Sequence, residues 1–179
     1  WPLGRRLRAE AVLGGVPTVQ RVHGEWYYVI DGMRSNGIAV RRSPKVLAYD
    51  KSAPKARPFG NEAVDMVARG AEEVREEAVG GREVKVYRLT DEAGRHEISV
   101  TDDDRALPLR IDSMDRASGV HIVTDYVEWL SELPLTAAFF EPDPRVEFER
   151  LEYDEYVQRA TRGPVGPAPV LFGDLLHGR

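Results

Sequence analysis

The side chains that most often perform chemistry are few in this sequence and widely spaced. Cysteine is absent, which excludes thiolate catalysis, disulfides and cysteine-based metal sites. No Gly-x-Ser-x-Gly elbow is present, so a hydrolase nucleophile is not indicated. The four histidines lack the His-x-x-x-His spacing of a transition-metal site; they are His23, His96, His121 and His177. These patterns predict exposed imidazoles, no bound metal and a protein that is not an enzyme.

Two further motifs have both a functional and a structural interpretation. The three aspartates at 102–104 would suit a calcium ion, but an EF-hand loop needs glycine at its sixth position, where Leu107 stands. We interpret them as a solvated turn that discourages pairing with other chains. The glycine pair at 80–81 follows a helical pattern and precedes a strand, the reverse of the order in phosphate-binding loops. No cofactor is therefore expected.

Aromatic and apolar side chains are more informative. Trp26, Tyr27 and Tyr28 are consecutive in a β-prone run, so a strand places aromatic rings on both of its faces, and both need cover. The stretches 126–130 and 139–140 have the same character. One explanation is a sheet covered by helices and returning chain. The other is a concave apolar pocket that holds an acyl chain or an apolar peptide.

Periodicity indicates the elements that position these residues. Alternation and tight turns predict three strands between Arg5 and Asp31, and a period of two over 84–125 predicts four more strands in an antiparallel meander. A short helix is expected near 45–49. A longer helix is expected over 62–78, where apolar residues recur at helical spacing. The expected fold class is α+β, with one sheet of about seven strands.

The C-terminal part carries a different pattern. A short helix is expected over 153–160, and the proline-rich stretch 163–169 favours an extended strap. The last segment places apolar residues at helical spacing, and we expect them to form a lid: Leu171, Phe172, Leu175 and Leu176. The expected organisation is a sheet domain over 1–160, with a helical excursion at about 44–78, followed by the strap and apolar segment over 161–179.

Composition and charge exclude several classes of protein. The 179 residues fit one domain, and a net charge of -5 without a basic block argues against nucleic-acid binding. The longest apolar run, Trp26 to Ile30, is too short to cross a bilayer. Because the numbering begins at a tryptophan, we expect that a leader has been removed or that the N-terminus has been cropped, which leaves open whether a helix precedes these residues.

Residues from about 81 to 144 resemble the outer-membrane lipoprotein-sorting (LolA-like) superfamily, which includes sigma-factor regulators of the RseB type and the mycobacterial lipoprotein LppX. The resemblance is carried by the order of short motifs: Gly81 to Leu89, Gly94, Leu107-Pro108-Leu109-Arg110, Gly119, Asp125-Tyr126 and Phe140-Glu141-Pro142. It implies an unclosed antiparallel β-barrel with helices packed against its concave face. It also implies a periplasmic or otherwise extracytoplasmic protein that carries or senses lipid-modified partners.

Two departures from the family pattern affect what is transferred. Family members begin with a helix that lies across the barrel, whereas strand-like sequence starts here near Arg5. We therefore expect the C-terminal segment to replace that helix. No residue matches the arginine that holds the family's lid, so none is assigned that role.

The leading hypothesis is a carrier-like protein that binds a lipid acyl chain or a lipid-modified protein in an apolar cavity. The cavity wall is expected from Trp26, Tyr28, Val84, Val86, Ile98, Val100, Leu109 and Ile122. A second hypothesis is a sensor domain that binds a membrane-associated partner protein through the same sheet face or its edge. A third is a small enzyme on the same fold, of the pigment-pathway kind, although no acid–base pair stands out.

Overall fold

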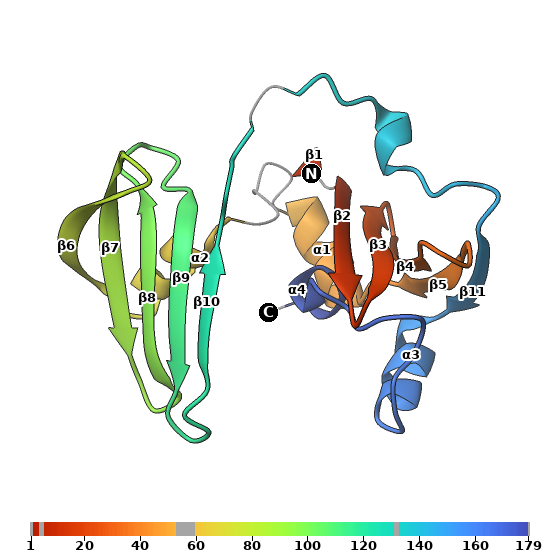
Figure 1. The fold of residues 1–179 in the computed structure, drawn as a ribbon. Coiled ribbons are helices and arrows are strands. Elements are labelled where there is room, and N and C mark those ends of the chain that lie inside the picture. Colours follow the sequence, from red (N-terminus) through yellow and green to blue (C-terminus); the bar gives the residue numbers. More distant parts are fainter. Residues whose placement is uncertain (1, 4–5, 53–59, 131–132, 179) are drawn as a thin grey trace. The chain divides into compact units, whose positions relative to one another are not determined.

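The computed structural model describes residues 2–3, 6–52, 60–130 and 133–178 and divides the chain into two compact units (Figure 1). The first unit combines residues 1–58 with 134–179, and the second comprises 59–133. Each unit has its own sheet, one of six strands and one of five. The expected α+β class is confirmed. The single sheet of about seven strands is replaced by two sheets, and neither limit of the units coincides with the expected boundary near residue 160.

The sheet of the first unit is antiparallel except at one edge. Its strands are β1 (Pro2–Leu3), β2 (Arg6–Leu13), β3 (Val16–His23), β4 (Trp26–Asp31), β5 (Asn36–Arg41) and β11 (Glu147–Leu151), in that spatial order. The three strands expected before Asp31 are confirmed as β2, β3 and β4. The two-residue turn between β2 and β3 uses Gly14 and Gly15, both with positive φ, as a primed hairpin turn requires. Strand β11 pairs with β5 in parallel, which local patterning did not predict.

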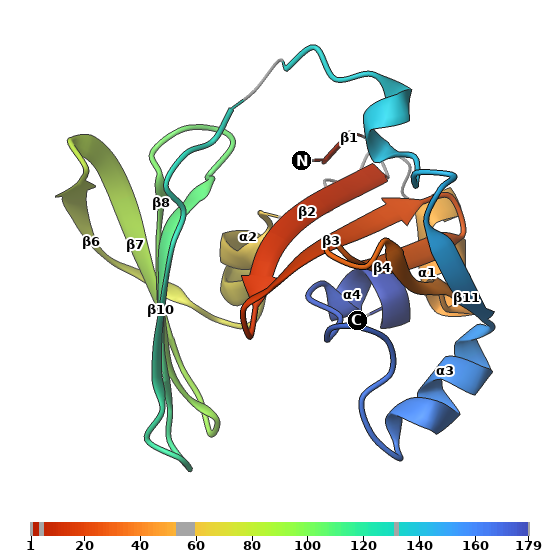
Figure 2. The ribbon, with the colours of Figure 1, turned by 45° about the vertical axis from the view of Figure 1, so that its right-hand side comes forward.

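Helices cover both faces of this first sheet. They are α1 (Pro44–Ser52), the 3₁₀ turn η1 (Ala137–Phe140), α3 (Tyr153–Ala160) and α4 (Gly173–His177). Strand β4 is buried on both faces as expected: Tyr27 and Val29 are fully buried on one, and Tyr28 and Ile30 pack with Ala39 on the other. Figure 2 shows α1 and α4 together beneath β2, β3 and β4.

The second unit contains the antiparallel meander that the alternating sequence predicts. Its elements are α2 (Glu62–Ala68), β6 (Glu72–Val79), β7 (Arg82–Thr90), β8 (Gly94–Thr101), β9 (Pro108–Asp115) and β10 (His121–Asp125), with strand order β10-β9-β8-β7-β6. Helix α2 covers one face, where Ala63 and Met66 pack against Leu89, Ile98 and Val100. The opposite face of this sheet therefore has no helix from the described part of the unit.

The long helix expected over 62–78 is wrong beyond Ala68. Gly70 adopts a φ of +96°, which a residue with a side chain adopts only at a cost, and the helix ends there. The following residues form β6, whose Arg75 and Glu77 reach neighbouring strands. The helical spacing of Val67, Ala71, Val74 and Ala78 was coincidental, because an acidic segment with few apolar residues fits either period. The helices expected near 45–49 and over 153–160 are present as α1 and α3.

Candidate functional site

The structure does not gather the eight expected wall residues on one surface. Trp26 and Tyr28 lie on β4 of the first unit, and the other six lie in the second unit. Tyr28 packs edge-on against Phe148, with 5.1 Å between ring centroids. Trp26 has the guanidinium groups of Arg41 and Arg150 over its ring at 5.9 and 5.2 Å. These two residues therefore belong to the core and rim of the first sheet.

The six wall residues of the second unit divide between the two faces of its sheet. Val84, Val86 and Leu109 form one buried cluster, and Ile98 and Val100 lie in the cluster beneath α2. The register of β10 on β9 points Ile122 to the α2 face, but this side chain is 58% exposed. The assignment of all six to one wall is therefore corrected. Its physical cause is the register of the β7–β8 hairpin, which pairs Val86 with Ser99 and places Ile98 on the opposite face.

The four expected lid residues do come together, on the sheet of the first unit. Leu176 is fully buried, and the carbonyl oxygen of Leu175 accepts a hydrogen bond from Arg42 Nε at 2.7 Å. The N–H of Leu171 donates to Gln20 Oε1 at 2.9 Å, and that of Phe172 to the Tyr27 hydroxyl at 3.3 Å. The segment is thus docked on the sheet, and its role as a lid over a ligand stays a prediction.

Two buried polar side chains that sequence reasoning missed hold this segment. Gln20 is fully buried and also donates from Nε2 to the carbonyl oxygen of Pro169 at 2.7 Å. The Gln20 amide therefore hydrogen-bonds one backbone C=O group and one backbone N–H group of this segment, as the backbone of a neighbouring strand would. Tyr27 donates its hydroxyl hydrogen to Gln20 Oε1, and burial raises the pKa of that phenol. The available sequence signal was a glutamine within the β-prone run 16–23.

The face of the second sheet that is opposite α2 is the candidate site, and we call it the amphipathic face. Over β6, β7 and β8 and the start of β9 it has an apolar half, Val79, Val84, Val86 and Leu109, and a charged half, Arg75, Glu77, Arg88, Arg95 and Glu97. Alternation along β7 explains the division, because Val84, Val86 and Arg88 all point to this face. Apolar and cationic side chains are thereby contiguous on one surface.

The apolar half is covered by Trp129, which comes from the irregular segment after β10. Its indole Nε1–H donates to the carbonyl oxygen of Pro108 at 2.6 Å. Tyr126 stacks on the same ring, with centroids 5.3 Å apart and planes 17° apart. Because the cover is a side chain on non-regular backbone, it can leave the sheet without breaking a strand.

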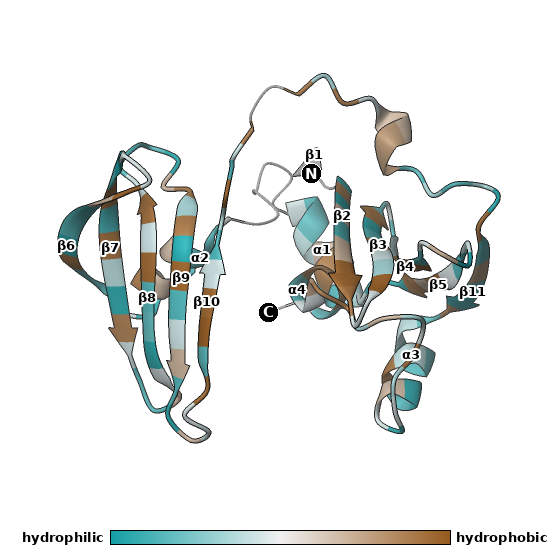
Figure 3. Ribbon diagram, viewed as in Figure 1, coloured by the Kyte–Doolittle hydropathy of each residue, from teal (hydrophilic) through white to brown (hydrophobic). Residues whose placement is uncertain are grey.

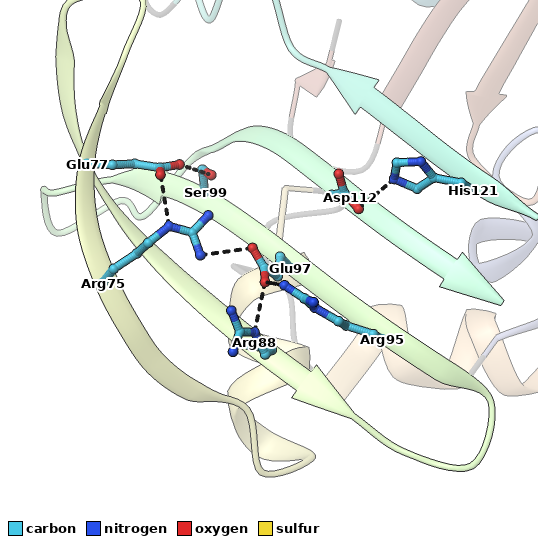
Figure 4. Close-up of polar contacts among 8 residues, drawn as sticks. All are labelled: Arg75, Glu77, Arg88, Arg95, Glu97, Ser99, Asp112 and His121. Atoms are coloured by element: carbon cyan, nitrogen blue, oxygen red, sulfur yellow. Dashed lines mark hydrogen bonds and ion pairs between the residues drawn. The ribbon is translucent and has the colours of Figure 1, made fainter. Parts of the chain in front are cut away.

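The charged half is centred on Glu97, which lies between three arginines (Figure 4). Its carboxylate accepts from Arg88 Nε at 2.8 Å, pairs with Arg75 Nη1 at 3.0 Å and also binds Arg95. Arg75 further donates to Glu77 at 2.9 Å. Three arginines face two glutamates within this cluster, and Asp112, which is opposite Glu97 in the β8–β9 register, adds a third carboxylate on the same face.

Glu97 is held as a carboxylate by these contacts. Burial acts to raise its pKa, but hydrogen bonds from Arg95, Arg88 and Arg75 outweigh burial and lower its pKa to about 2. A carboxylate in this state neither accepts a proton near neutral pH nor acts as a general acid. The ionised Glu97 therefore holds the three arginines together as a cluster before any ligand binds.

Two histidines of the second sheet each contact a polar side chain, as a catalytic histidine would. On the amphipathic face, His121 Nε2 lies 2.8 Å from Asp112 Oδ1, and both side chains are more than 40% exposed. On the α2 face, His96 Nδ1 lies 3.0 Å from Ser113 Oγ. Within the described part of the chain, neither pair shows the third group that would complete a nucleophile–base–orienter arrangement.

The described residues contain no group of three or more His, Asp or Glu side chains placed to hold a metal ion. The aspartates at 102–104 act as expected for a turn. Asp103 accepts from the Thr101 hydroxyl and from the N–H groups of Arg105 and Ala106, and Asp102 pairs with Lys85 at 2.7 Å. Among the same residues, no helix has the length and apolar character needed to span a membrane.

A pocket lies on the first unit, between α3 and the C-terminal helix α4. It is an open pocket of about 350 Å³ lined by Tyr153, Tyr156, Val157, Ala160, Thr161 and His177. Tyr153 and His177 hydrogen-bond across it at 3.1 Å. Sequence reasoning did not find this pocket, because the residues come from two segments that meet only in the fold.

Comparison with known proteins gives no family assignment: the chain matches no protein-family model and no curated protein significantly.

Proposed function

We propose that the chain is a non-enzymatic lipid-binding protein whose amphipathic face takes a ligand with an apolar chain and an anionic head group. The observation that supports this proposal is the placement of an apolar patch, covered by one aromatic side chain, next to a cluster of arginines. Fatty acids, which carry a carboxylate at one end of an apolar chain, have this combination of properties.

The apolar half supplies the driving force for binding. Val84, Val86 and Leu109 are 1%, 0% and 6% exposed with Trp129 in place. An acyl chain that displaces the indole keeps this surface away from water, so the gain, at about 25 cal/mol per Å², is set by the apolar ligand surface that is buried minus the indole surface that becomes exposed. The displaced Trp129 gives up its hydrogen bond to Pro108, which water replaces, and its stacking on Tyr126.

The charged half supplies selectivity for the head group. The side chains of Arg75, Arg88 and Arg95 are 41%, 37% and 57% exposed, so their guanidinium groups reach solvent while they remain paired with Glu97. Guanidinium forks bind carboxylate and phosphate oxygens in pairs, and they bind more strongly than neutral donors. A neutral lipid would leave this half unused.

The partner-binding hypothesis is the second candidate. It is favoured by a separate observation, the exposed strand at one edge of the same sheet, where all five residues of β10 are exposed. A periplasmic location and the binding of lipid-modified proteins stay predictions of the sequence resemblance.

The test of lipid binding is titration with a fluorescent fatty acid at constant ionic strength. Arg95→Gln removes one guanidinium from the amphipathic face, and we expect affinity to fall about fivefold or more, as for the loss of one charge-assisted hydrogen bond. Arg105→Gln is the matched control, because Arg105 is 60% exposed and also pairs with an acid two residues away, Asp103, but lies in a turn. The control should bind like the wild type. Equal affinities for all three proteins would overturn the proposed head-group site.

A further inference from the structure

Strand β10 presents an unguarded edge of the second sheet. All five of its residues are exposed, and within the described residues it pairs only with β9. Ile122 and Val123 at its centre are 58% and 39% exposed, and Val120 just before it is 50% exposed. Such an edge is a template for another strand.

The hydrogen bonds to β9 establish which backbone groups face outward. Asp115 N–H donates to the carbonyl oxygen of Val120, and Tyr126 N–H donates to that of Leu109. In an antiparallel pair the bonded residues alternate, so the even-numbered residues of β10 bond with β9. The N–H and C=O groups of His121, Val123 and Asp125 therefore point away from β9.

The opposite edge of the sheet, β6, is protected where β10 is not. Four of its eight residues are glutamates and one is an arginine, and its pairing with β7 is interrupted by an irregularity between Glu73 and Arg75. Charges and bulges are two of the devices that prevent sheet edges from pairing. Figure 3 shows the contrast, with β6 hydrophilic over most of its length and a hydrophobic stretch on β10. Of the two edges, β10 is therefore the one suited to pairing with another strand.

We infer that two copies of this chain associate through β10, antiparallel and about a two-fold axis at Val123. In this register Val123 pairs with Val123 of the second copy, Ile122 with Thr124, and His121 with Asp125. The outward groups of residues 121, 123 and 125 then form six backbone hydrogen bonds. Two five-stranded sheets become one continuous sheet.

Charge complementarity selects a second copy as the partner. His121 and Asp125 are the titratable residues of β10, and the two-fold register places each opposite the other rather than opposite itself. On its own sheet, His121 contacts Asp112 and Asp125 pairs with Arg110 on β9, so oppositely charged groups alternate along this edge. No like charges meet across the axis, and two apolar side chains meet at its centre. An isologous contact of this kind closes with two chains, so it predicts a dimer and not a fibre.

This inference goes beyond the proposed lipid site, because it rests on the outward backbone groups of β10 and not on the arginine cluster or the apolar half. The two can be tested separately. The association is measured by sedimentation velocity over about 1–500 µM, a range suited to a small interface. Wild-type protein should shift from monomer towards dimer as its concentration rises.

Val123→Lys and Val123→Glu test the position of the axis. Each places like charges against each other at the two-fold axis, and each alone should weaken association about tenfold or more. An equimolar mixture of the two should recover dimers, because lysine then faces glutamate. Val74→Lys is the control: Val74 is 37% exposed on β6, close to the 39% of Val123, and this change should leave association as in the wild type.

Recovery in the mixture also rules out misfolding as the reason for loss in the single variants. Wild-type protein that stays monomeric over the whole range overturns the inference. So does a dimer that Val123→Lys leaves intact, or single variants whose mixture remains monomeric.

Discussion

Glu97 illustrates how one side chain organises the proposed site. Its carboxylate is 13% exposed and binds three arginines from three different strands, β6, β7 and β8. Without it, three guanidinium groups of the same sign would lie on one face and repel each other. Glu97 thus contributes to stability and keeps the arginines available to an anionic ligand.

The stability contributed by Glu97 has a defined pH dependence. Its folded pKa, about 2, lies below the ordinary value of 4.5, so the contribution is present above pH 4.5 and is lost as pH falls towards 2. We expect Glu97→Gln to lower the free energy of unfolding near pH 7 by on the order of 2–3 kcal/mol. In urea titrations the gap between wild type and variant should close between pH 4.5 and 2. A gap that is constant over this range would contradict the account of the arginine cluster.

Sequence reasoning at the scale of residues found part of the candidate site. Val84, Val86 and Leu109 were expected in one cavity wall, and they do share a face and a buried cluster, whereas their contact with a ligand stays a prediction. Ile98 and Val100 were placed with them wrongly, because alternation gives the parity within a strand but not the register between strands. Trp129 stands in an aromatic stretch of the sequence, but the sequence does not predict its position over this face, because it lies on irregular chain without periodicity.

At the scale of elements, the docked C-terminal segment depends on a glycine. Gly166 has a φ of +84°, and a Cβ there would lie 2.7 Å from Ile38 Cδ1 on β5. Both backbone conformation and packing therefore favour a residue without a side chain. The strap is seated on the sheet at this point as well as through Gln20.

Gly166→Ala should destabilise the protein by about 1–3 kcal/mol, from left-handed strain and the clash with Ile38. Gly173→Ala is the control, because the nearest atom to a new Cβ there is His177 Cδ2 at 3.7 Å, an ordinary contact. We expect the control to be neutral within about 0.5 kcal/mol. Thermal and urea unfolding measure both. A Gly166→Ala variant as stable as the control would show that the strap does not require this seat.

The elements that could be predicted are those with strong local periodicity. The meander from β7 to β10 and helices α1 and α3 follow from alternation or helical spacing and from turn residues. Strand β6 was mistaken for helix because its few apolar residues fit both periods. The parallel pairing of β11 with β5 joins residues more than 100 positions apart, and nothing local encodes it. The division into two sheets was not predicted for the same reason, because it depends on pairings between strands far apart in the sequence.

At the scale of the whole molecule, both proposals use the second unit, and they use different parts of it. The proposed lipid site uses side chains of one sheet face, whereas the proposed dimer uses backbone groups of one sheet edge. The first unit binds its own C-terminal segment through Gln20 and Tyr27. The open pocket beside His177 also lies on that unit.

The central claim, that an acyl chain takes the place of the Trp129 indole, is tested most directly by fluorescence quenching with a brominated fatty acid. The sequence has three tryptophans, and the Trp129→Phe variant isolates the contribution of this one. We predict that the bromine quenches wild-type emission on binding and that Trp129→Phe loses most of this quenching while its circular dichroism spectrum is retained. Equal quenching in the two proteins, or none in the wild type at saturating ligand, would contradict the account.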